Sequence, residues 1–316
     1  MLLCVIDPMF KTWLSSYRSI VLSPLRSGVQ RRPVSSFIII TLVWSWSMWW
    51  LLRSHPALEP HSRLWTCLYV SGLSGPMVGA FAISLFTNGT KGIRSLLAQF
   101  CLPPISPLWY LSVIFLPIGA WMLAARLGHW HVRFGQPAAL ILILWLKMLV
   151  RGGPLTEELG WRGFLLPALV SRSNLFWATV TLIPIWAAWH LPLWFLPGVP
   201  HGSWSFPMFL LLLVPVTLIF SWLYVKGQGN LLLPILFHTS INTSFHFVPM
   251  VPPWNSSNSG FLVLLGFFWI TAILLVLANR ELWFRRPPAR IPVHPAAEFQ
   301  NDQLPMTNYK LQITND

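Results

Sequence analysis

The sequence predicts an all-α polytopic membrane protein, a bundle of about eight transmembrane helices, and three observations lead to this fold class. Charged residues make up 9% of the 316 residues and hydrophobic residues 55%, whereas an ordinary globular domain is about one quarter charged. Apolar runs close to the ~20 residues that a helix needs to cross a bilayer recur along the chain. Basic residues gather between these runs, so the net charge of +13 indicates contact with an anionic cytoplasmic membrane face and not with nucleic acid.

The predicted spans follow one another behind a basic leader, residues 1–33, which we expect to be cytoplasmic and uncleaved. They cover Val34–Leu52, Leu64–Phe86, Pro107–Ala125, Pro137–Val150, Leu175–Leu196, Phe206–Val225, Leu231–Val248 and Gly260–Ala278. A further apolar helix over Leu155–Val170 follows the breaker Arg151-Gly-Gly-Pro154 and is expected to be half-inserted or interfacial. The chain thus divides into the leader, N-terminal membrane helices (34–136), a second group of helices (137–284) and a proline-rich tail (285–316) that we expect to be disordered and cytoplasmic.

The basic residues also predict an orientation. With the N-terminus in the cytoplasm and eight spans, sixteen Lys and Arg residues fall inside, and only four fall outside: Arg53, Arg63, Arg126 and Arg133. Because cytoplasmic loops are enriched in Lys and Arg, both termini are expected inside, most simply at the plasma membrane. The three cysteines form no CxxC pair, which excludes a zinc ribbon or a disulfide framework.

Acidic residues inside the apolar segments carry the functional information. Of the eight acidic residues only Glu157 and Glu158 lie within an apolar segment, where an ionised side chain costs about 2.5–3.5 kcal/mol at the centre of a membrane helix. Glu158 and Arg162 are four residues apart, the spacing of an ion pair on a helix. An interfacial helix would explain that pair, but Glu157 points about 100° away from Glu158 and lacks a partner.

Two later spans carry further polar groups. His190 lies near the end of the fifth predicted span, and His238 and Asn242 are four residues apart on the seventh. Taken singly, each could be a packing residue or an interhelical hydrogen bond. Taken together, a carboxylate and histidines in a dry cavity suit activation of a water molecule, with polar donors left to stabilise the oxyanion that forms at a carbonyl.

At these residues the sequence resembles the CPBP family of CAAX proteases and bacteriocin-processing enzymes, also called the Abi family. The family pattern is Glu-Glu-x-x-x-Arg, then aromatic-x-x-x-His, then His-x-x-x-Asn on successive membrane helices. Here these patterns read Glu157-Glu158-Leu-Gly-Trp-Arg162, Trp186-Ala-Ala-Trp-His190 and His238-Thr-Ser-Ile-Asn242. Trp186 stands where the family usually has phenylalanine.

The resemblance implies an intramembrane endopeptidase that hydrolyses peptide bonds of membrane-associated peptide or protein substrates, in CAAX-type or bacteriocin-type processing. It implies that Glu157 with His238 activates the water, that His190 and Asn242 bind the oxyanion, and that Glu158 and Arg162 form a supporting pair. No cofactor is certain. If the reaction requires a metal such as zinc, Glu157, His190 and His238 are the candidate ligands, although the HExxH pattern of zincins is absent.

Other readings remain open at this stage. Gly72-Leu-Ser74-Gly75 matches a short pattern of rhomboid serine proteases, but close helix packing explains it better. An aspartyl mechanism lacks any aspartate in the spans. A non-enzymatic scaffold or immunity protein could retain the same cavity, and a proton-coupled transporter could also use membrane Glu and His, although its polar residues should then be spread over several spans.

Overall fold

The computed structural model describes residues 28–101, 105–128, 138–203, 205–247 and 259–285, and all regular structure among them is helical. The predicted all-α class is therefore confirmed. Most of the predicted leader (1–33) and all but the first residue of the predicted tail (285–316) lie outside the described residues.

The helices begin and end within a few residues of most predicted spans. Their bounds are α3 Pro33–Arg53, α4 Arg63–Leu73, α5 Gly75–Ala98, α6 Pro107–Leu127, α7 Ala138–Arg151, α8 Pro154–Gly160, α9 Leu166–Val170, α10 Leu175–His190, α11 Phe206–Lys226, α12 Leu232–Phe247, α13 Ser259–Ala278 and α14 Arg280–Phe284. A π-helical turn, Trp161–Leu165, joins α8 to α9, and short 3₁₀ turns at Leu191–Phe195 and Pro200–Ser203 follow α10.

Six helical segments of the described residues are long and apolar enough to cross a membrane, or seven if the bent pair α4–α5 counts as one span. The protein is thus an integral membrane protein. The difference from the eight predicted spans has two sources. The helix α12 has 16 residues, fewer than a full crossing needs, and the predicted span Leu64–Phe86 is divided between the bent helices α4 and α5.

The second predicted span is broken where the sequence reads Gly75-Pro76. The helices α4 and α5 meet there at 50°, because proline cannot continue the hydrogen bonding of the preceding turn. Gly75 packs directly against Ser45 of α3, where a side chain would not fit. The Ser74 hydroxyl donates to the Ser71 carbonyl at 2.7 Å, so this serine belongs to a packed helix junction and has no described histidine partner, which disfavours the rhomboid reading.

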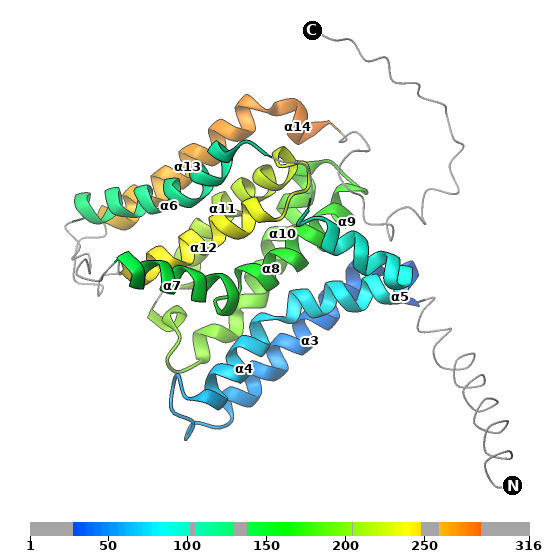
Figure 1. Ribbon diagram of the computed structural model, residues 1–316, viewed down its shortest axis with the longest axis horizontal. Helices are drawn as coiled ribbons and strands as arrows, with labels where there is room; N and C mark the ends of the chain where they lie inside the picture. Colours follow the sequence, from blue (N-terminus) through cyan, green and yellow to red (C-terminus); the bar gives the residue numbers. More distant parts are fainter. Residues whose placement is uncertain (1–27, 102–104, 129–137, 204, 248–258, 286–316) are drawn as a thin grey trace, which may run out of the picture.

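The segment that carries the two glutamates lies in the middle of the bundle. Figure 1 shows α8 between the α3–α5 group and the pair α7 and α12, and α8 contacts α5, α7 and α12. Residues 157–170 are all buried, so the helix predicted to be half-inserted or interfacial is enclosed by protein. The helices α6 and α13 lie together on the side of the bundle away from α3 and α4 (Figure 1).

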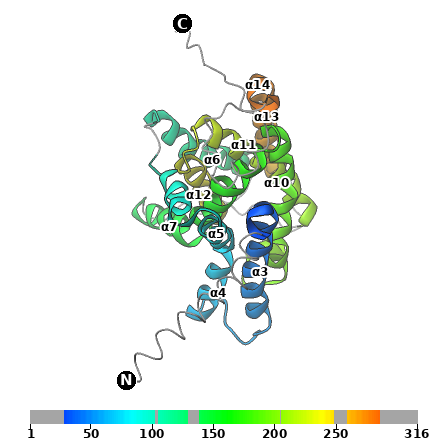
Figure 2. The same ribbon diagram turned by 90° about the vertical axis from the view of Figure 1, so that its right-hand side faces the viewer.

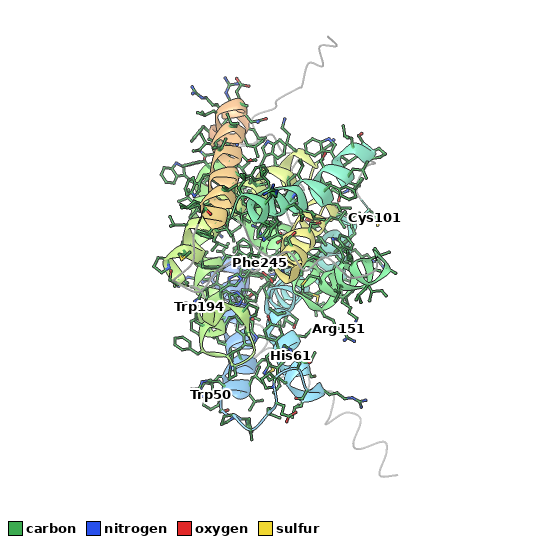
Figure 3. The ribbon with its side chains drawn as sticks, turned by 90° about the vertical axis from the view of Figure 1, so that its left-hand side faces the viewer. Trp50, His61, Cys101, Arg151, Trp194 and Phe245 are labelled. Atoms are coloured by element: carbon green, nitrogen blue, oxygen red, sulfur yellow. The ribbon has the colours of Figure 1, made fainter. Side chains whose placement is uncertain are left out.

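The surface of the bundle is apolar where a membrane would contact it. Large side chains such as Ile39, Phe115, Leu262 and Ile270 are more than half exposed, as expected for lipid-facing positions. Seen from the side, α4 and one end of α3 project beyond the other helices (Figure 2). Figure 3 shows Trp50 and His61 together at this projecting end.

Candidate active site

The buried glutamates follow a sharp entry into α8. Gly153 adopts φ +98°, a conformation that favours glycine, and Pro154 occupies the first turn, where its missing N–H costs nothing. The Thr156 hydroxyl donates to the carbonyls of Leu73 (3.1 Å) and Gly153 (3.0 Å). This threonine therefore ties α8 to the end of α4 and does not accept a bond from the helix N-terminus.

Glu158 links the two later polar positions. Its Oε1 accepts a hydrogen bond from Arg162 Nη1 at 3.0 Å and another from His238 Nδ1 at 2.8 Å. Glu158 and Arg162 are fully buried and His238 is 6% exposed. The predicted pair of Glu158 and Arg162 is thus present in the structure, and the same oxygen also binds the histidine of α12.

Arg162 belongs to the π-helical turn, which widens the helix at this point. Single π turns within α-helices occur frequently at functional sites. The guanidinium carbon of Arg162 lies 4.5 Å from the Trp186 ring centroid and 4.3 Å from that of Phe220, so two aromatic faces enclose the cation in addition to Glu158. The π turn therefore directs a buried charge back towards the residues of α8 and α10.

Glu157 has a different partner from Glu158. Its Oε2 accepts a hydrogen bond from Trp186 Nε1 at 3.0 Å, while its Oε1 lies against Gly153 and has no hydrogen-bond partner among the described residues. The side chain is 3% exposed. One oxygen of this buried carboxylate is thus held in place and the other remains available to a small ligand such as water.

His190 is fixed by the backbone of its own helix. Its Nδ1 lies 2.7 Å from the Trp186 carbonyl oxygen, and because a carbonyl only accepts, Nδ1 carries the hydrogen. The ring centroid lies 5.8 Å from that of His201 in the second 3₁₀ turn and 4.9 Å from that of Phe209 in α11. His190 therefore points into an aromatic environment with its Nε2 not engaged by a described residue.

Asn242 connects α12 to the loop before α8. Its Nδ2 donates to the Gly152 carbonyl at 3.3 Å, which leaves one amide hydrogen for another acceptor. Since His238 and Asn242 are separated by one turn of α12, they share a face of that helix. The six residues predicted from the sequence thus come from α8, the π turn, α10 and α12, which pack around the same buried region.

The residues that the sequence did not single out for a role are Trp186, Phe220 and His201. Trp186 contacts more of the polar cluster than any predicted residue, through its indole, its carbonyl and its ring faces. The sequence contained a signal for it, namely tryptophan at a position where the CPBP pattern usually has phenylalanine. Phe220 and His201 carry no comparable pattern, because their role follows from tertiary packing alone.

The proposed zinc ligands do not fit a metal site in this arrangement. No three His, Cys, Asp or Glu side chains among the described residues are grouped so that they could hold a metal ion. The hydrogen bond from Trp186 occupies one oxygen of Glu157, and His238 is directed by Glu158 instead of by Glu157. The chemistry below therefore uses only the side chains of the chain.

Comparison with known proteins identifies the region that holds this cluster. Residues 137–244 match the family model of type II CAAX prenyl endopeptidases, Rce1-like. The chain is also 27% identical over 136 residues to CAAX prenyl protease 2 of Methanococcus maripaludis, an alignment that covers 41% of this chain and 48% of that protein. The match thus spans about half the length of this relative. All six candidate residues lie within the region, residues 137–244, that is similar to Rce1-like CAAX prenyl endopeptidases.

Proposed function

We propose that the protein is an intramembrane endopeptidase in which Glu157 activates a water molecule for attack on a peptide bond. The observation that carries this proposal is the pair of adjacent buried carboxylates with separate tasks. Both hydrogen bonds to Glu158, from Arg162 and His238, fall on its Oε1, and its Oε2 is buried without a described partner. Glu157 is bonded only by Trp186, through Oε2, so it is not committed to the arginine and its Oε1 is available. A buried carboxylate with an available oxygen is suited to take a proton from water.

The hydrogen bonds favour an exchange of the roles that the family resemblance implied for the two histidines. Since Nδ1 of His190 donates to a carbonyl, the Nε2 of the neutral ring is an acceptor. It can hold a water molecule beside Glu157 but cannot donate to an oxyanion. We therefore assign His190 to the water.

His238 is the better donor to the oxyanion. Its Nδ1 donates to Oε1 of Glu158, so a carboxylate already fixes the orientation of this ring. A hydrogen on Nε2 as well as on Nδ1 would let this ring donate to the oxyanion, and the remaining amide hydrogen of Asn242 lies one helical turn away on the same face. Two donors from α12 would then stabilise the negative oxygen of the tetrahedral intermediate.

The reaction follows from these positions. Glu157 accepts a proton as the water oxygen bonds to the carbonyl carbon, and the carbonyl electrons move to the oxygen facing His238 and Asn242. When the intermediate collapses, the C–N bond breaks and the proton held by Glu157 passes to the leaving nitrogen. The side chains return to their starting protonation states, and no other reactant is consumed.

The substrate class that we propose is a membrane-associated polypeptide with a lipidated CAAX-type C-terminus. The name of the relative from Methanococcus maripaludis and that of the family model both refer to CAAX prenyl substrates. A prenyl group would partition into the bilayer that surrounds the apolar helices and so deliver the peptide bond at the depth of the buried site. Bacteriocin-type processing is the alternative peptide substrate.

The test uses the purified protein in detergent and a fluorogenic peptide that ends in a farnesylated CAAX sequence. The wild type should release the C-terminal tripeptide, and Glu157→Gln should lower kcat by at least about 100-fold, the contribution expected of a general base. Glu281→Gln is the matched control, because Glu281 is an exposed glutamate paired with Arg285, and it should cleave like the wild type.

The outcomes separate the competing functions. Near-parent activity of Glu157→Gln would exclude Glu157 as the base. Cleavage of the peptide with and without farnesyl would exclude the lipid as a determinant of the substrate. Binding of the farnesylated peptide without any cleavage by the wild type would support a non-enzymatic scaffold or immunity protein.

A further inference from the structure

Trp186 is the residue through which the polar groups of the site are connected. Its indole N–H donates to Glu157, and its carbonyl accepts from His190 Nδ1. Its ring lies edge-on to His238, with centroids 5.9 Å apart and planes at 80°, and under the guanidinium of Arg162. One buried side chain thus contacts a residue from each of the three patterns found in the sequence.

The indole N–H performs a task that a phenylalanine ring cannot. The Glu157 carboxylate can rotate about its final torsion, which has a broad energy minimum. The bond from Nε1 to Oε2 selects one orientation and leaves Oε1 as the available oxygen. Without this bond the carboxylate could rotate, so that Oε1 and Oε2 of Glu157 exchange places. No oxygen would then be held at a defined position for a water molecule.

Burial alone does not account for the hydrogen bond. Trp121, Trp161 and Trp222 have buried Nε1 atoms that lack any hydrogen-bond partner among the described residues, so this bundle accommodates tryptophans with unbonded indoles. Trp189, one turn further along α10, donates to the Ser45 hydroxyl at 2.7 Å and thereby joins α10 to α3. Trp186 instead donates to Glu157 of the candidate site, so its hydrogen bond does not join α10 to α3.

We propose that Trp186 is a positioning residue of the reaction, whose indole N–H holds the Glu157 carboxylate in the orientation that activates water. This inference rests on the proposed function for its catalytic consequence. It explains why tryptophan replaces the phenylalanine usual in the resembled family. The backbone bond to His190 is available to any residue, and the ring contacts with Arg162 and His238 need only an aromatic one.

The first experiment compares Trp186→Phe with Trp189→Phe in the farnesylated peptide assay. Each substitution keeps an aromatic ring and removes one indole N–H from the same helix. Trp186→Phe should lower kcat by about 10- to 100-fold, which corresponds to loss of one hydrogen bond to a charged group, with KM within threefold of the wild type. Trp189→Phe should lower the melting temperature while kcat per folded molecule stays within threefold.

The second experiment does not depend on turnover. The twenty tryptophans are labelled with ¹⁵N at the indole, and the signal missing from the Trp186→Phe spectrum identifies Trp186. In Glu157→Gln this signal should shift by more than the line width, because its acceptor loses its charge, whereas in Glu281→Gln it should not move. The measurement reports on the hydrogen bond whether or not the peptide is a substrate.

The two experiments together decide the proposal. A shifted signal with a lower kcat and an unchanged KM supports a positioning role. An unshifted signal in Glu157→Gln, or a Trp186→Phe variant with kcat within threefold of the wild type, overturns it. If the wild type cleaves none of the peptides, the proposed function fails, and the NMR signal alone then decides whether Trp186 orients Glu157.

Discussion

Nδ1 of His238 lies 2.8 Å from Oε1 of Glu158, the same oxygen that accepts a hydrogen bond from Arg162 Nη1 at 3.0 Å. A single carboxylate oxygen therefore joins the π-helical turn to α12. Because the three side chains are buried, loss of one would leave another without its charge partner. From this arrangement we expect Glu158 and Arg162 to be structural as well as functional, and the consequences can be measured.

Glu158→Gln and Arg162→Ala should each reduce both stability and turnover. Removing one member of a buried ion pair leaves an uncompensated charge, which lowers the free energy of unfolding by about 3–5 kcal/mol. Thermal unfolding in detergent measures the first effect. The peptide assay measures the second, which arises because His238 loses its orientation when Glu158 is neutral or displaced.

The exposed pair of Glu281 and Arg285 supplies the control for these variants. It has the same i, i+4 spacing on a helix, and both side chains are about three quarters exposed. Glu281→Gln and Arg285→Ala should leave the melting temperature and kcat unchanged, since exposed ion pairs contribute little. Melting temperatures equal to the wild type in Glu158→Gln and Arg162→Ala would show that the buried pair is not structural.

The fold and the identity of the polar cluster were accessible from sequence because both depend on one-dimensional patterns. Apolar run length predicts most helix ends, as in α11, where Phe206–Val225 was expected and Phe206–Lys226 is observed. The i, i+4 spacing of Glu158 and Arg162 likewise predicts their contact. Local patterns of this kind are independent of how the helices are arranged.

Contacts between helices were less accessible. Nothing in the spacing of residues indicates that His238 binds Glu158 and that Glu157 binds Trp186, because each contact joins segments from different parts of the chain. The π turn at Trp161–Leu165 has no sequence signature comparable to proline or glycine at a kink. The position of the Leu155–Val170 segment also depends on its neighbours, which bury a helix that its charges made seem interfacial.

Gly153→Ala should impair the reaction through both its backbone and its side chain. A residue other than glycine at φ +98° carries strain of about 1–3 kcal/mol, and the added methyl group would occupy the place of Glu157 Oε1. We expect kcat to fall by at least tenfold in the peptide assay because the carboxylate must move.

Gly89→Ala separates strain from displacement of the carboxylate. Gly89 also has a positive φ, +61°, but an added methyl group would meet no atom within 4 Å. This variant should show a lower melting temperature and a normal kcat. If the two alanine variants were equally active, the contact between residue 153 and Glu157 would have no functional importance.

His201 predicts a dependence of stability on pH. It lies in the turn Pro200–Ser203, outside the candidate membrane spans, and burial lowers the pKa of its imidazole from 6.5 to about 4. The unfolded chain binds a proton at this residue below pH 6.5 while the folded protein does not. The contribution of His201 to stability is therefore complete above pH 6.5 and is lost as the pH falls towards 4.

The measurement is the melting temperature in detergent between pH 7.5 and 4.5, for the wild type and for His201→Phe. Phenylalanine preserves a ring beside Trp194 and Phe209 but cannot titrate, so the melting temperature of this variant should fall less steeply on acidification. His55→Gln, at an exposed histidine, should follow the wild-type curve. Equal slopes for all three proteins would mean that His201 titrates alike in the folded and unfolded states.

Chelation should leave peptide cleavage intact. The reason lies in the donors themselves: no three His, Cys, Asp or Glu side chains among the described residues converge on one point, and one oxygen of Glu157 is already bound by Trp186. We expect kcat after dialysis against 1,10-phenanthroline to lie within about twofold of the untreated value. A change of this size is on the order of assay error and well below a tenfold loss of rate, which corresponds to about 1.4 kcal/mol in activation free energy. Metal analysis of the active protein should find less than stoichiometric zinc. Loss of activity that added zinc restores would instead require Glu157, His190 and His238 to rearrange into a ligand set, and the free-oxygen assignment of Glu157 would then be wrong.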